Sequence, residues 1–282
     1  MSQAGETDAP PPNILSIAGS DPSGGAGVQT DLKAIGAMGG YGMAALTALT
    51  AQNTRGVDAV MLAPPEFARA QIDAVFADVR VDAVKIGMIG SAAIAEAVAA
   101  SLDAAGARNI VLDPVMVATS GDRLLDEDAA TLLRARLAPM ARVITPNTAE
   151  AAALLEDEEP RDRAAMAAAA TRLLAFGPEA VLLKGGHLSG GESPDLLMLE
   201  HGPIWLEGVR IAGRPIHGGG CSLASALATA LGHGLSLEAA SRRAKAFVAE
   251  AITGADRLRV GSGARPLDHF GALLRRAAGG DG

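Results

Sequence analysis

The sequence predicts an α/β fold of three layers, in which helices cover both faces of one central, mainly parallel sheet. The chain has 282 residues, 49% of them hydrophobic and 20% charged, which is enough to bury a large core. Short apolar runs alternate with alanine-rich amphipathic stretches, and this order is typical of parallel strands joined by helices. Most of the predicted strands end in a glycine-rich or polar turn. Because such turns meet at one edge of an open α/β sheet, we expect one binding site there.

The first half of the chain contains four predicted strands, which are short apolar runs, and three predicted helices with amphipathic periodicity. The strands lie at 13–20 (NILSIAGS), 43–52 (MAALTALTAQ), 83–90 (AVKIGMIG) and 109–115 (NIVLDPV). The helices lie between them, at 26–38, 65–77 and 91–105. This regular order predicts that the strands are parallel.

The second half continues the alternation and adds one pair of strands with no helix between them. Strands are predicted at 142–147 (RVITPN), 180–187 (AVLLKGGH), 194–199 and 204–211, and helices at 127–138, 148–156, 161–176, 221–232 and 236–252. Residues 1–12 carry acidic side chains without an apolar signal core, so we expect a disordered leader. Residues 13–270 are predicted to form a single domain, and the glycine-rich residues 271–282 a flexible tail.

Composition argues against several classes of partner. The net charge is −8 and the basic residues are scattered singly, which disfavours nucleic acids and membrane surfaces. The chain has one cysteine, so it can form neither an internal disulfide nor a CxxC metal site, and a reducing compartment fits. The apolar stretches are broken well before the roughly 20 residues that span a membrane. The sequence therefore predicts a cytoplasmic protein that acts on small molecules.

Two common nucleotide-binding motifs are absent from the sequence. The segment GSDPSGGAGVQTD after the first strand lacks the lysine and the hydroxyl of a P-loop, and no GxGxxG motif follows that strand. A chain with this sequence that binds ATP must therefore do so with another architecture.

The segment HGGGCSLASALATALGHG offers such an alternative, because a glycine loop runs into a helix there. The N–H groups at a helix start lack intrahelical partners, and glycines let an anion approach them closely. We therefore expect an anion hole for a transferring phosphoryl group. Its residues are Gly218, Gly219, Gly220 and Cys221. The same field is expected to lower the pKa of the Cys221 thiol, which would then accept a proton from a substrate hydroxyl. A buried cysteine after a flexible loop fits the same residues.

Four polar residues at other strand ends are candidates for binding ATP and Mg²⁺. Asn147 and Glu150 begin a helix, where they either form a capping box or hold Mg²⁺ against phosphates, directly or through water. Asp113 ends an apolar strand, where a carboxylate is rarely needed for packing, and is a second magnesium or phosphate-side candidate. Lys184 is either a phosphate ligand or an ordinary exposed lysine.

Gln52 ends the apolar run LTALTAQ and is a candidate for reading a heterocycle. Its amide carries a donor and an acceptor side by side, which matches the ring nitrogen and exocyclic amine of an aminopyrimidine. The amide would equally satisfy nearby backbone groups. Since aromatic residues make up only 2% of the chain, we expect a planar ligand to lie between aliphatic side chains such as Met88 and Val115.

Taken together, these motifs resemble the hydroxymethylpyrimidine and phosphomethylpyrimidine kinases of thiamine biosynthesis, in the ribokinase superfamily. The resemblance extends from about residue 13 to residue 270 and is carried by ILSIAGSDPSGGAGVQTDLKAIGAMGGYG, LTAQNTRGV, VKIGMIGS, VLDPVMVATSGDRLL, VITPNTAEAAALL, VLLKGGH and the glycine-cysteine helix start. It implies a ribokinase-like domain that uses ATP and Mg²⁺. Such an enzyme phosphorylates 4-amino-5-hydroxymethyl-2-methylpyrimidine and then its monophosphate. The resemblance also implies a homodimer.

The same resemblance implies roles for individual residues. Gln52 would bind the pyrimidine, with Gly19 and Asp31 in the same pocket. Cys221 would be the catalytic base, the glycines before it the anion hole, and Asn147 with Glu150 the magnesium-linked motif.

One segment departs from the family pattern N-T-H-G-T-G-C. This chain has Pro215 and Ile216 in place of Asn-Thr, and Gly219 in place of the second threonine. A glycine there is expected to make the loop more mobile, at about 0.5 to 1 kcal/mol, and the enzyme slower. Two other functions fit the sequence: a pyridoxal kinase, and a pyrimidine-binding homologue without catalysis.

Overall fold

The computed structural model describes residues 9–116, 127–186, 188, 191–211, 213 and 215–279. In these residues an eight-stranded sheet has the order β10-β9-β8-β7-β6-β5-β1-β2. Its strands are β1 (Asn13–Ala18), β2 (Tyr41–Leu46), β5 (Ala83–Ile86), β6 (Ile110–Leu112), β7 (Val143–Ile144), β8 (Ala180–Leu183), β9 (Asp195–Leu199) and β10 (Gly202–Leu206). The strands from β8 to β2 pair in parallel, and β9 and β10 are antiparallel. The predicted, mainly parallel sheet is confirmed.

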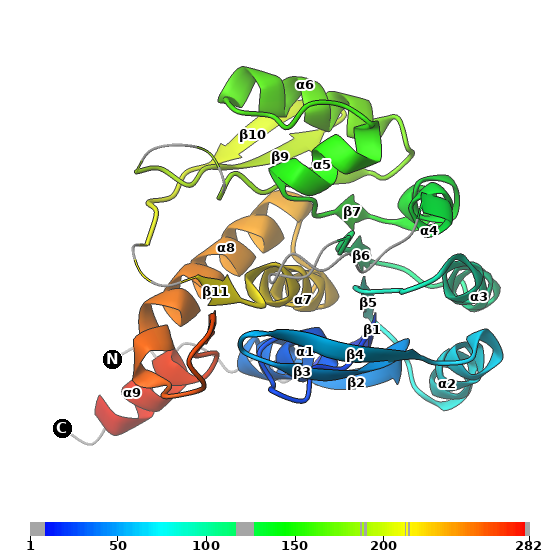
Figure 1. The fold of residues 1–282 in the computed structure, drawn as a ribbon, viewed down its shortest axis with the longest axis horizontal. Coiled ribbons are helices and arrows are strands. Elements are labelled where there is room, and N and C mark those ends of the chain that lie inside the picture. The colour runs from blue at the N-terminus through cyan, green and yellow to red at the C-terminus, as the bar shows by residue number, and fades with distance from the viewer. Residues whose placement is uncertain are drawn as a thin grey trace.

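Helices cover both faces of this sheet (Figure 1). They are α1 (Gly27–Ala37), α2 (Pro65–Asp78), α3 (Ala92–Ala104), α4 (Glu127–Leu132), α5 (Thr148–Leu155), α6 (Arg163–Leu174), α7 (Gly219–Gly232) and α8 (Leu237–Gly254). The core is correspondingly divided in two: Leu15 and Ile17 of β1 pack with α2 to α6, whereas Ile14 packs with α1, α7 and α8. Successive strand residues thus face opposite layers, which confirms the three-layer architecture.

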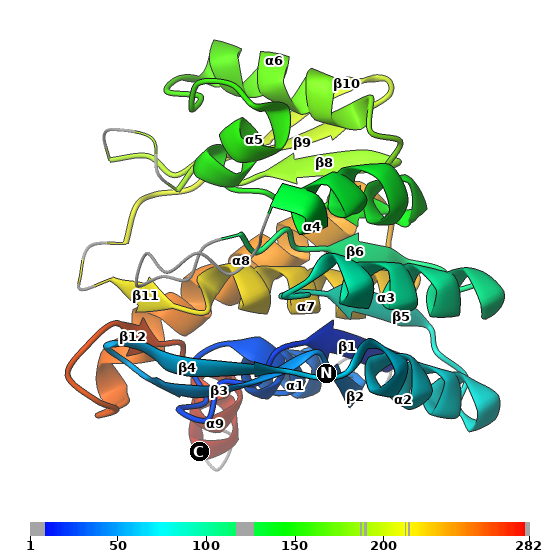
Figure 2. The ribbon, with the colours of Figure 1, turned by 45° about the vertical axis from the view of Figure 1, so that its right-hand side comes forward.

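The predicted strand 43–52 is two strands, and this expectation was wrong. β2 ends at Leu46, and the chain then forms a hairpin of β3 (Ala48–Asn53) and β4 (Gly56–Leu62), which belongs to a separate antiparallel sheet. Figure 2 shows this hairpin extending from the sheet edge toward β11 (Ile216–His217) and β12 (Arg265–Pro266). The break falls at Thr47, in an uninterrupted apolar run without glycine or proline, so no turn residue marks it. We call the hairpin β3–β4 the flap.

The C-terminal segment is more ordered than the sequence predicts. The expected flexible tail begins with a helix, α9 (Gly271–Gly279), and Arg275 in it pairs with Glu250 of α8 at 3.4 Å. At the other end, Pro12 of the expected leader is buried and accepts a hydrogen bond from the Tyr41 N–H at 2.9 Å. Residues 1–8 and 280–282 lie outside the described part of the chain. None of the helices in the described part is long and apolar enough to cross a membrane.

Candidate active site

A cavity of about 930 Å³ lies where the parallel strands reach their carboxyl ends. Residues of the flap and of the start of α7 are among those that line it. It is lined by every site residue that the sequence predicts except Asp31. These are Gly19, Gln52, Met88, Asp113, Val115, Asn147, Glu150, Lys184, Gly218, Gly219, Gly220 and Cys221. The expectation that the strand ends form one site is consistent with this geometry.

The glycine loop before α7 is shaped by one contact that only glycine allows. Gly218 has a φ of 79°, and a Cβ there would lie 1.9 Å from the carbonyl oxygen of Gly25. The helix begins at Gly219, and Ser222 donates to the Gly218 carbonyl at 2.9 Å in the first turn. Helix geometry leaves the N–H groups of residues 219–221 without intrahelical acceptors, at the cavity wall. These are the groups that the sequence proposes as an anion hole.

The Cys221 thiol differs from the sequence-based expectation. Burial raises its pKa to about 11, and the carboxylates of Asp31 and Asp113 act in the same direction. The Lys85 ammonium opposes them but does not outweigh burial. The expected lowering of the pKa was therefore wrong, because desolvation disfavours the charged thiolate more strongly than the neighbouring positive groups favour it.

Asp31 lies behind the cavity wall rather than in it. Its carboxylate is fully buried on α1 and accepts hydrogen bonds from Ser16 (2.6 Å), Lys85 (2.9 Å) and Ser225 (2.8 Å). Lys85 is itself among the lining residues. Burial alone would lower the pKa of its ammonium, but Asp31 raises it above the ordinary value. Asp31 thus holds a buried cation beside Cys221, and it is separated from the cavity rather than lining it.

At the other end of the cavity, Lys184 joins two carboxylates. Its Nζ lies 3.0 Å from Asp113 Oδ1 and 3.6 Å from Glu150 Oε2. Asp113 Oδ1 also accepts a hydrogen bond from Thr145 at 3.0 Å. A Cβ on Gly220 would lie 3.1 Å from Lys184 Nζ, so the start of α7 adjoins this cluster. Lys184 is therefore not an ordinary exposed lysine.

Asn147 and Glu150 do form the capping box that was one of their two expected roles. The Asn147 side chain accepts from the Glu150 N–H at 2.8 Å, and Glu150 Oε2 accepts from the Asn147 N–H at 2.7 Å. The pKa of Glu150 is raised to about 6. Burial is the main cause and the Asp113 carboxylate acts in the same direction, while the Lys184 ammonium acts against both. Since both residues also line the cavity, capping and a role in binding are compatible here.

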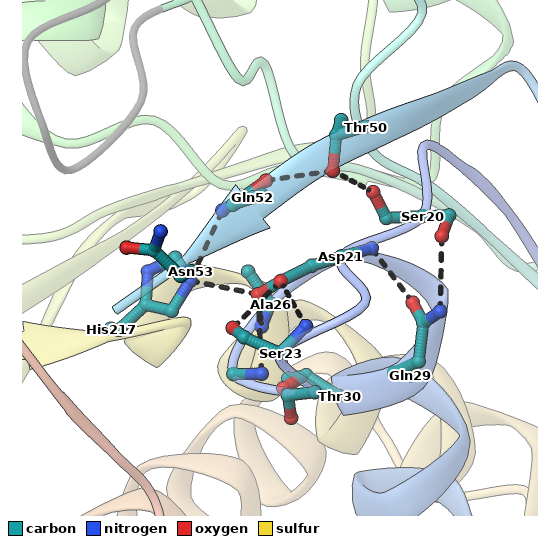
Figure 3. Close-up of polar contacts among 12 residues, drawn as sticks. Ser20, Asp21, Ser23, Ala26, Gln29, Thr30, Thr50, Gln52, Asn53 and His217 are labelled. Atoms are coloured by element: carbon teal, nitrogen blue, oxygen red, sulfur yellow. Dashed lines mark hydrogen bonds and ion pairs between the residues drawn. The ribbon is translucent and has the colours of Figure 1, made fainter. Parts of the chain in front are cut away.

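Gln52 lies in a chain of polar contacts at the opposite end of the cavity (Figure 3). Its amide is 3.1 Å from the Thr50 hydroxyl and 3.2 Å from His217 Nε2. His217 Nε2 in turn lies 2.9 Å from Asp21 Oδ2. Burial would raise the pKa of Asp21, but hydrogen bonds from His217 and Ser23 hold it below its ordinary value.

Gly19 allows Met88 to approach this part of the wall, since a Cβ on Gly19 would lie 3.1 Å from the Met88 sulfur. Among the lining residues that the sequence analysis missed are Lys85, Asp21 and His217. Lys85 interrupts the apolar strand AVKIG, and Asp21 and His217 are the charged or titratable residues beside glycine loops. Both patterns were available signals.

The chain matches a family model and curated proteins over most of its length. The model described as phosphomethylpyrimidine kinase matches residues 21–268. A hydroxymethylpyrimidine/phosphomethylpyrimidine kinase of Salmonella typhimurium is 48% identical over 260 residues, covering 92% of this chain and 98% of that protein. A thiamine biosynthesis bifunctional protein of Geobacter sulfurreducens is 46% identical over 262 residues, covering 92% of this chain and 52% of that protein.

Solved structures of two kinds are also similar. A phosphomethylpyrimidine kinase of Clostridium difficile has 39% sequence identity and a TM-score of 0.75, covering 86% of this chain and 99% of that one. A pyridoxal kinase of Bacillus subtilis in complex with ADP has 32% identity and a TM-score of 0.86, covering 94% of this chain and 99% of that one. Sequence identity is thus higher to the pyrimidine kinase, while the overall shape is shared by both.

Proposed function

The chain belongs to the phosphomethylpyrimidine kinase family, and on this premise we propose that it phosphorylates 4-amino-5-hydroxymethyl-2-methylpyrimidine and then its monophosphate, with ATP as the donor. The product is the diphosphate used in thiamine biosynthesis. The observation that carries the proposal is the position of Cys221. It lies at the start of α7, in one cavity with Gln52 at one end and the Asp113–Lys184–Glu150 cluster at the other.

Each end of the cavity suits one reactant. The Gln52 amide lines the cavity at the flap end, and the apolar side chains of Met88 and Val115 in the same lining are suited to hold a flat ring. At the cluster end, Lys184 provides a cation next to the N–H groups of the α7 start, and such a combination binds phosphate groups. The acceptor hydroxyl and the transferring phosphoryl group would therefore meet at residues 219–221.

In the first reaction, the hydroxymethyl oxygen attacks the γ-phosphorus of ATP. The new O–P bond forms as the bond from γ-phosphorus to the bridging oxygen breaks, ADP leaves, and the hydroxyl proton passes to Cys221 Sγ. In the second reaction a phosphate oxygen of the monophosphate attacks the γ-phosphorus of a second ATP, the bond to the bridging oxygen breaks, and ADP leaves again. The N–H groups of residues 219–221 would stabilise the negative charge of the phosphoryl group in transfer.

The carboxylates of the cluster fit Mg²⁺. Magnesium is usually bound through one or two carboxylates together with substrate phosphates and water. Asp113 and Glu150 provide two carboxylates around one Lys184 ammonium, although no group of three His, Cys, Asp or Glu side chains within the described ranges is arranged to hold a metal. When bound, the ion would neutralise charge on the phosphate oxygens. Asp113, Glu150 and Asn147 are the residues that we expect to hold it.

Product analysis by mass spectrometry tests the proposal directly. The pure protein is incubated with Mg·ATP and either hydroxymethylpyrimidine or pyridoxal. We expect pyrimidine monophosphate followed by diphosphate, and little pyridoxal phosphate. Pyridoxal phosphate alone, or no product despite pyrimidine binding, would contradict the proposal.

Two controls assign the chemistry within the same assay. Cys221→Ala should lose most phosphoryl transfer while still binding the pyrimidine, because it removes the base and no ring contact. Excess EDTA should abolish product formation and restored Mg²⁺ should recover it. Wild-type turnover in Cys221→Ala would contradict the role of the base, and turnover in EDTA would contradict the role of the metal.

We also propose that the protein is a cytoplasmic homodimer. The flap and the start of α2 expose apolar side chains that ordinarily lie inside an interface: Leu49, Val60, Met61, Leu62 and Phe67. A second copy of the chain is the proposed occupant of this surface. The single cysteine supports a reducing compartment.

A further inference from the structure

The amide of Gln52 is held between two neighbours whose hydrogen-bonding character can be worked out (Figure 3). One neighbour is His217 Nε2, and the other is the Thr50 hydroxyl. An amide presents a donor at its nitrogen and an acceptor at its oxygen. The two neighbours therefore decide which way round the amide lies.

His217 Nε2 must carry a hydrogen. It lies 2.9 Å from Asp21 Oδ2, and both oxygens of this carboxylate are otherwise occupied as acceptors. Oδ1 accepts from the Ser23 N–H and hydroxyl, and Oδ2 accepts from the N–H groups of Gly25 and Ala26. These contacts, and the lowered pKa of Asp21, make the group an ionised carboxylate. An ionised carboxylate only accepts hydrogen bonds, so His217 donates to it.

The Thr50 hydroxyl, in contrast, must accept from Gln52. The hydroxyl has a single hydrogen, and its oxygen lies 2.8 Å from the carbonyl oxygen of Ser20, which can only accept. Thr50 therefore donates to Ser20. The lone pairs of the hydroxyl remain for the Gln52 atom at 3.1 Å.

Both neighbours require the same arrangement of the amide. With the amide nitrogen toward His217, the N–H of Gln52 would face the N–H of His217. The amide oxygen would then face the lone pairs of the Thr50 hydroxyl. With its nitrogen toward Thr50, Gln52 donates to the free lone pairs of the hydroxyl. With its oxygen toward His217, it shares the one Nε2 hydrogen of His217 with Asp21 in a three-centre hydrogen bond, in which Asp21 at 2.9 Å is the stronger acceptor and Gln52 at 3.2 Å the weaker. Amide oxygen and nitrogen are almost equal in size, and their placement follows from their partners. Rotation of the amide by half a turn gives this arrangement without moving any other atom.

We infer that His217, held by Asp21, is a positioning residue that orients the pyrimidine by fixing the amide of Gln52. This inference rests on the proposed substrate. Gln52 Oε1 would accept from the exocyclic amine and Nε2 would donate to the adjacent ring nitrogen, so the amine lies on the His217 side. The hydroxymethyl group is bonded to the carbon next to the amine-bearing carbon. It therefore also lies on the His217 side, where the chain continues through Gly218 to Cys221.

The reverse amide would bind the same ring edge with the amine and the hydroxymethyl group turned toward Thr50. The ring would then occupy the pocket with its reacting oxygen away from the segment that carries Cys221. His217 thus selects the productive orientation and touches neither the phosphoryl donor nor, in this arrangement, the reacting oxygen.

A pair of substrates that differ in the polar edge tests this role. The 4-oxo analogue, 5-hydroxymethyl-2-methylpyrimidin-4-one, carries an N–H and a carbonyl where the substrate has a ring nitrogen and an amine. The analogue can place its hydroxymethyl group on the His217 side only if the Gln52 amide is reversed. We therefore expect the wild-type kcat/KM to favour the amino substrate by about 100-fold or more. In His217→Leu only Thr50 still holds the amide, and the repulsion that disfavours the reversed amide on the His217 side is gone. The ratio of the two kcat/KM values should therefore fall at least about tenfold.

The matched control is Ser23→Ala, which removes another hydrogen bond to the same Asp21 carboxylate but makes no contact with Gln52. It should keep the wild-type ratio. If His217→Leu lowers both kcat/KM values equally and leaves their ratio unchanged, His217 has only a structural role and the inference is overturned.

A second measurement does not depend on the variant. In a crystal structure of the wild-type protein with the bound aminopyrimidine, the amine should lie on the His217 side of Gln52. An amine on the Thr50 side would overturn the inference, even if His217→Leu does not fold. If the wild type makes no pyrimidine phosphate, the proposed function fails, and the same crystal structure still decides the orientation.

Discussion

The thiol of Cys221 lies at the start of α7 among groups that act on it in opposite directions. Lys85 lowers its pKa, Asp31 and Asp113 raise it, and burial raises it most, to about 11. An acid with a pKa of about 11 is protonated at neutral pH and ionises only as the pH approaches that value. The proposed base is therefore the thiolate form, which is a minor form at neutral pH and arises when the thiol proton passes to solvent. The N–H groups of the helix start and Lys85 are the groups that stabilise the thiolate there.

The rate of Cys221 alkylation by iodoacetamide should reflect this raised pKa. The chain has one cysteine, so the rate reports on Cys221 alone. At pH 7.5 we expect alkylation roughly 100-fold slower than in the same protein unfolded in urea, where the thiol has a pKa near 8.5. The rate of the folded protein should rise about tenfold per pH unit up to pH 10. A plateau below pH 8 would instead mean a lowered pKa.

Gly218 and Gly219 are neighbours with opposite structural requirements. Gly218 has a φ of 79° and touches the Gly25 carbonyl, whereas a Cβ on Gly219 would meet only the Ile216 side chain, at 3.6 Å. Gly219 is also the first residue of α7. A Cβ at position 219 thus has room, and the glycine relaxes the chain without being required by the fold.

Alanine at each of these two positions should therefore change stability in opposite directions. Gly219→Ala should stabilise the fold by about 0.4 to 1 kcal/mol, because it restricts the unfolded chain at a helical position. Gly218→Ala should destabilise it by about 1 to 3 kcal/mol through backbone strain, before the clash with Gly25 is counted. Urea unfolding of both variants measures these changes. Equal losses would show that residue 219 also needs a glycine.

Among the elements, the segment between α8 and α9 joins two parts of the site. Its Ala264 N–H donates to the Thr54 carbonyl at the tip of the flap, at 2.9 Å, and the Gly263 N–H donates to the Thr54 hydroxyl at 3.2 Å. The next residues form β12, which pairs with β11 and so with His217. The flap that carries Gln52 and the strand that carries His217 are thus held by the same segment.

Disturbing this segment should weaken the pyrimidine end of the cavity alone. A Cβ on Gly263 would lie 1.9 Å from the Thr54 carbonyl oxygen, so Gly263→Val must displace the flap tip. We expect KM for the pyrimidine to rise about tenfold, the cost of one lost hydrogen bond, while KM for ATP stays within about twofold. Gly36→Ala is the control, since a Cβ at Gly36 of α1 meets no atom within 4 Å. Parallel increases in both constants would contradict the separation of the two ends.

For the whole molecule, the apolar surface of the flap has the composition of an interface. Met61 is 63% exposed and Phe67 is 61% exposed, although side chains of this size are usually buried. Met61 lies on the flap, which lines the proposed pyrimidine pocket, and Phe67 lies near the start of α2. A second copy packed there would therefore also fix the flap over the substrate.

A charge at the centre of this surface should separate the proposed dimer. We expect Met61→Asp to be a monomer in light scattering at concentrations at which the wild type is a dimer, because the charge would be buried without a partner. Leu274→Asp is the matched control, since Leu274 is 61% exposed and belongs to α9 rather than to the flap or α2. A wild-type protein that is already monomeric, or a dimeric Met61→Asp, would exclude this interface.

The sequence by itself determined the layers and the edge at which the site lies. Alternation of apolar runs and amphipathic stretches is a local property of the chain, and it predicted the parallel sheet and its helices well. The polar residues that end each strand lie at one edge because parallel strands share their direction. Asp113, Asn147 and Lys184 could therefore be assigned to one cavity before any contact was known. Gln52 reaches the same cavity from the flap, and Cys221 reaches it from the start of α7.

Only the tertiary structure decided what surrounds each of these residues. The chain turns at Thr47 without a turn-forming residue. The flap forms because β3 pairs with β4 and because its tip contacts residues 263–264. The pKa of Cys221 depends on burial and on Lys85, a residue 136 positions away in the sequence. Asp21 and His217 are 196 positions apart and meet at 2.9 Å. Desolvation and hydrogen-bond partnership are properties of the packed molecule, so no local pattern in the chain encodes them.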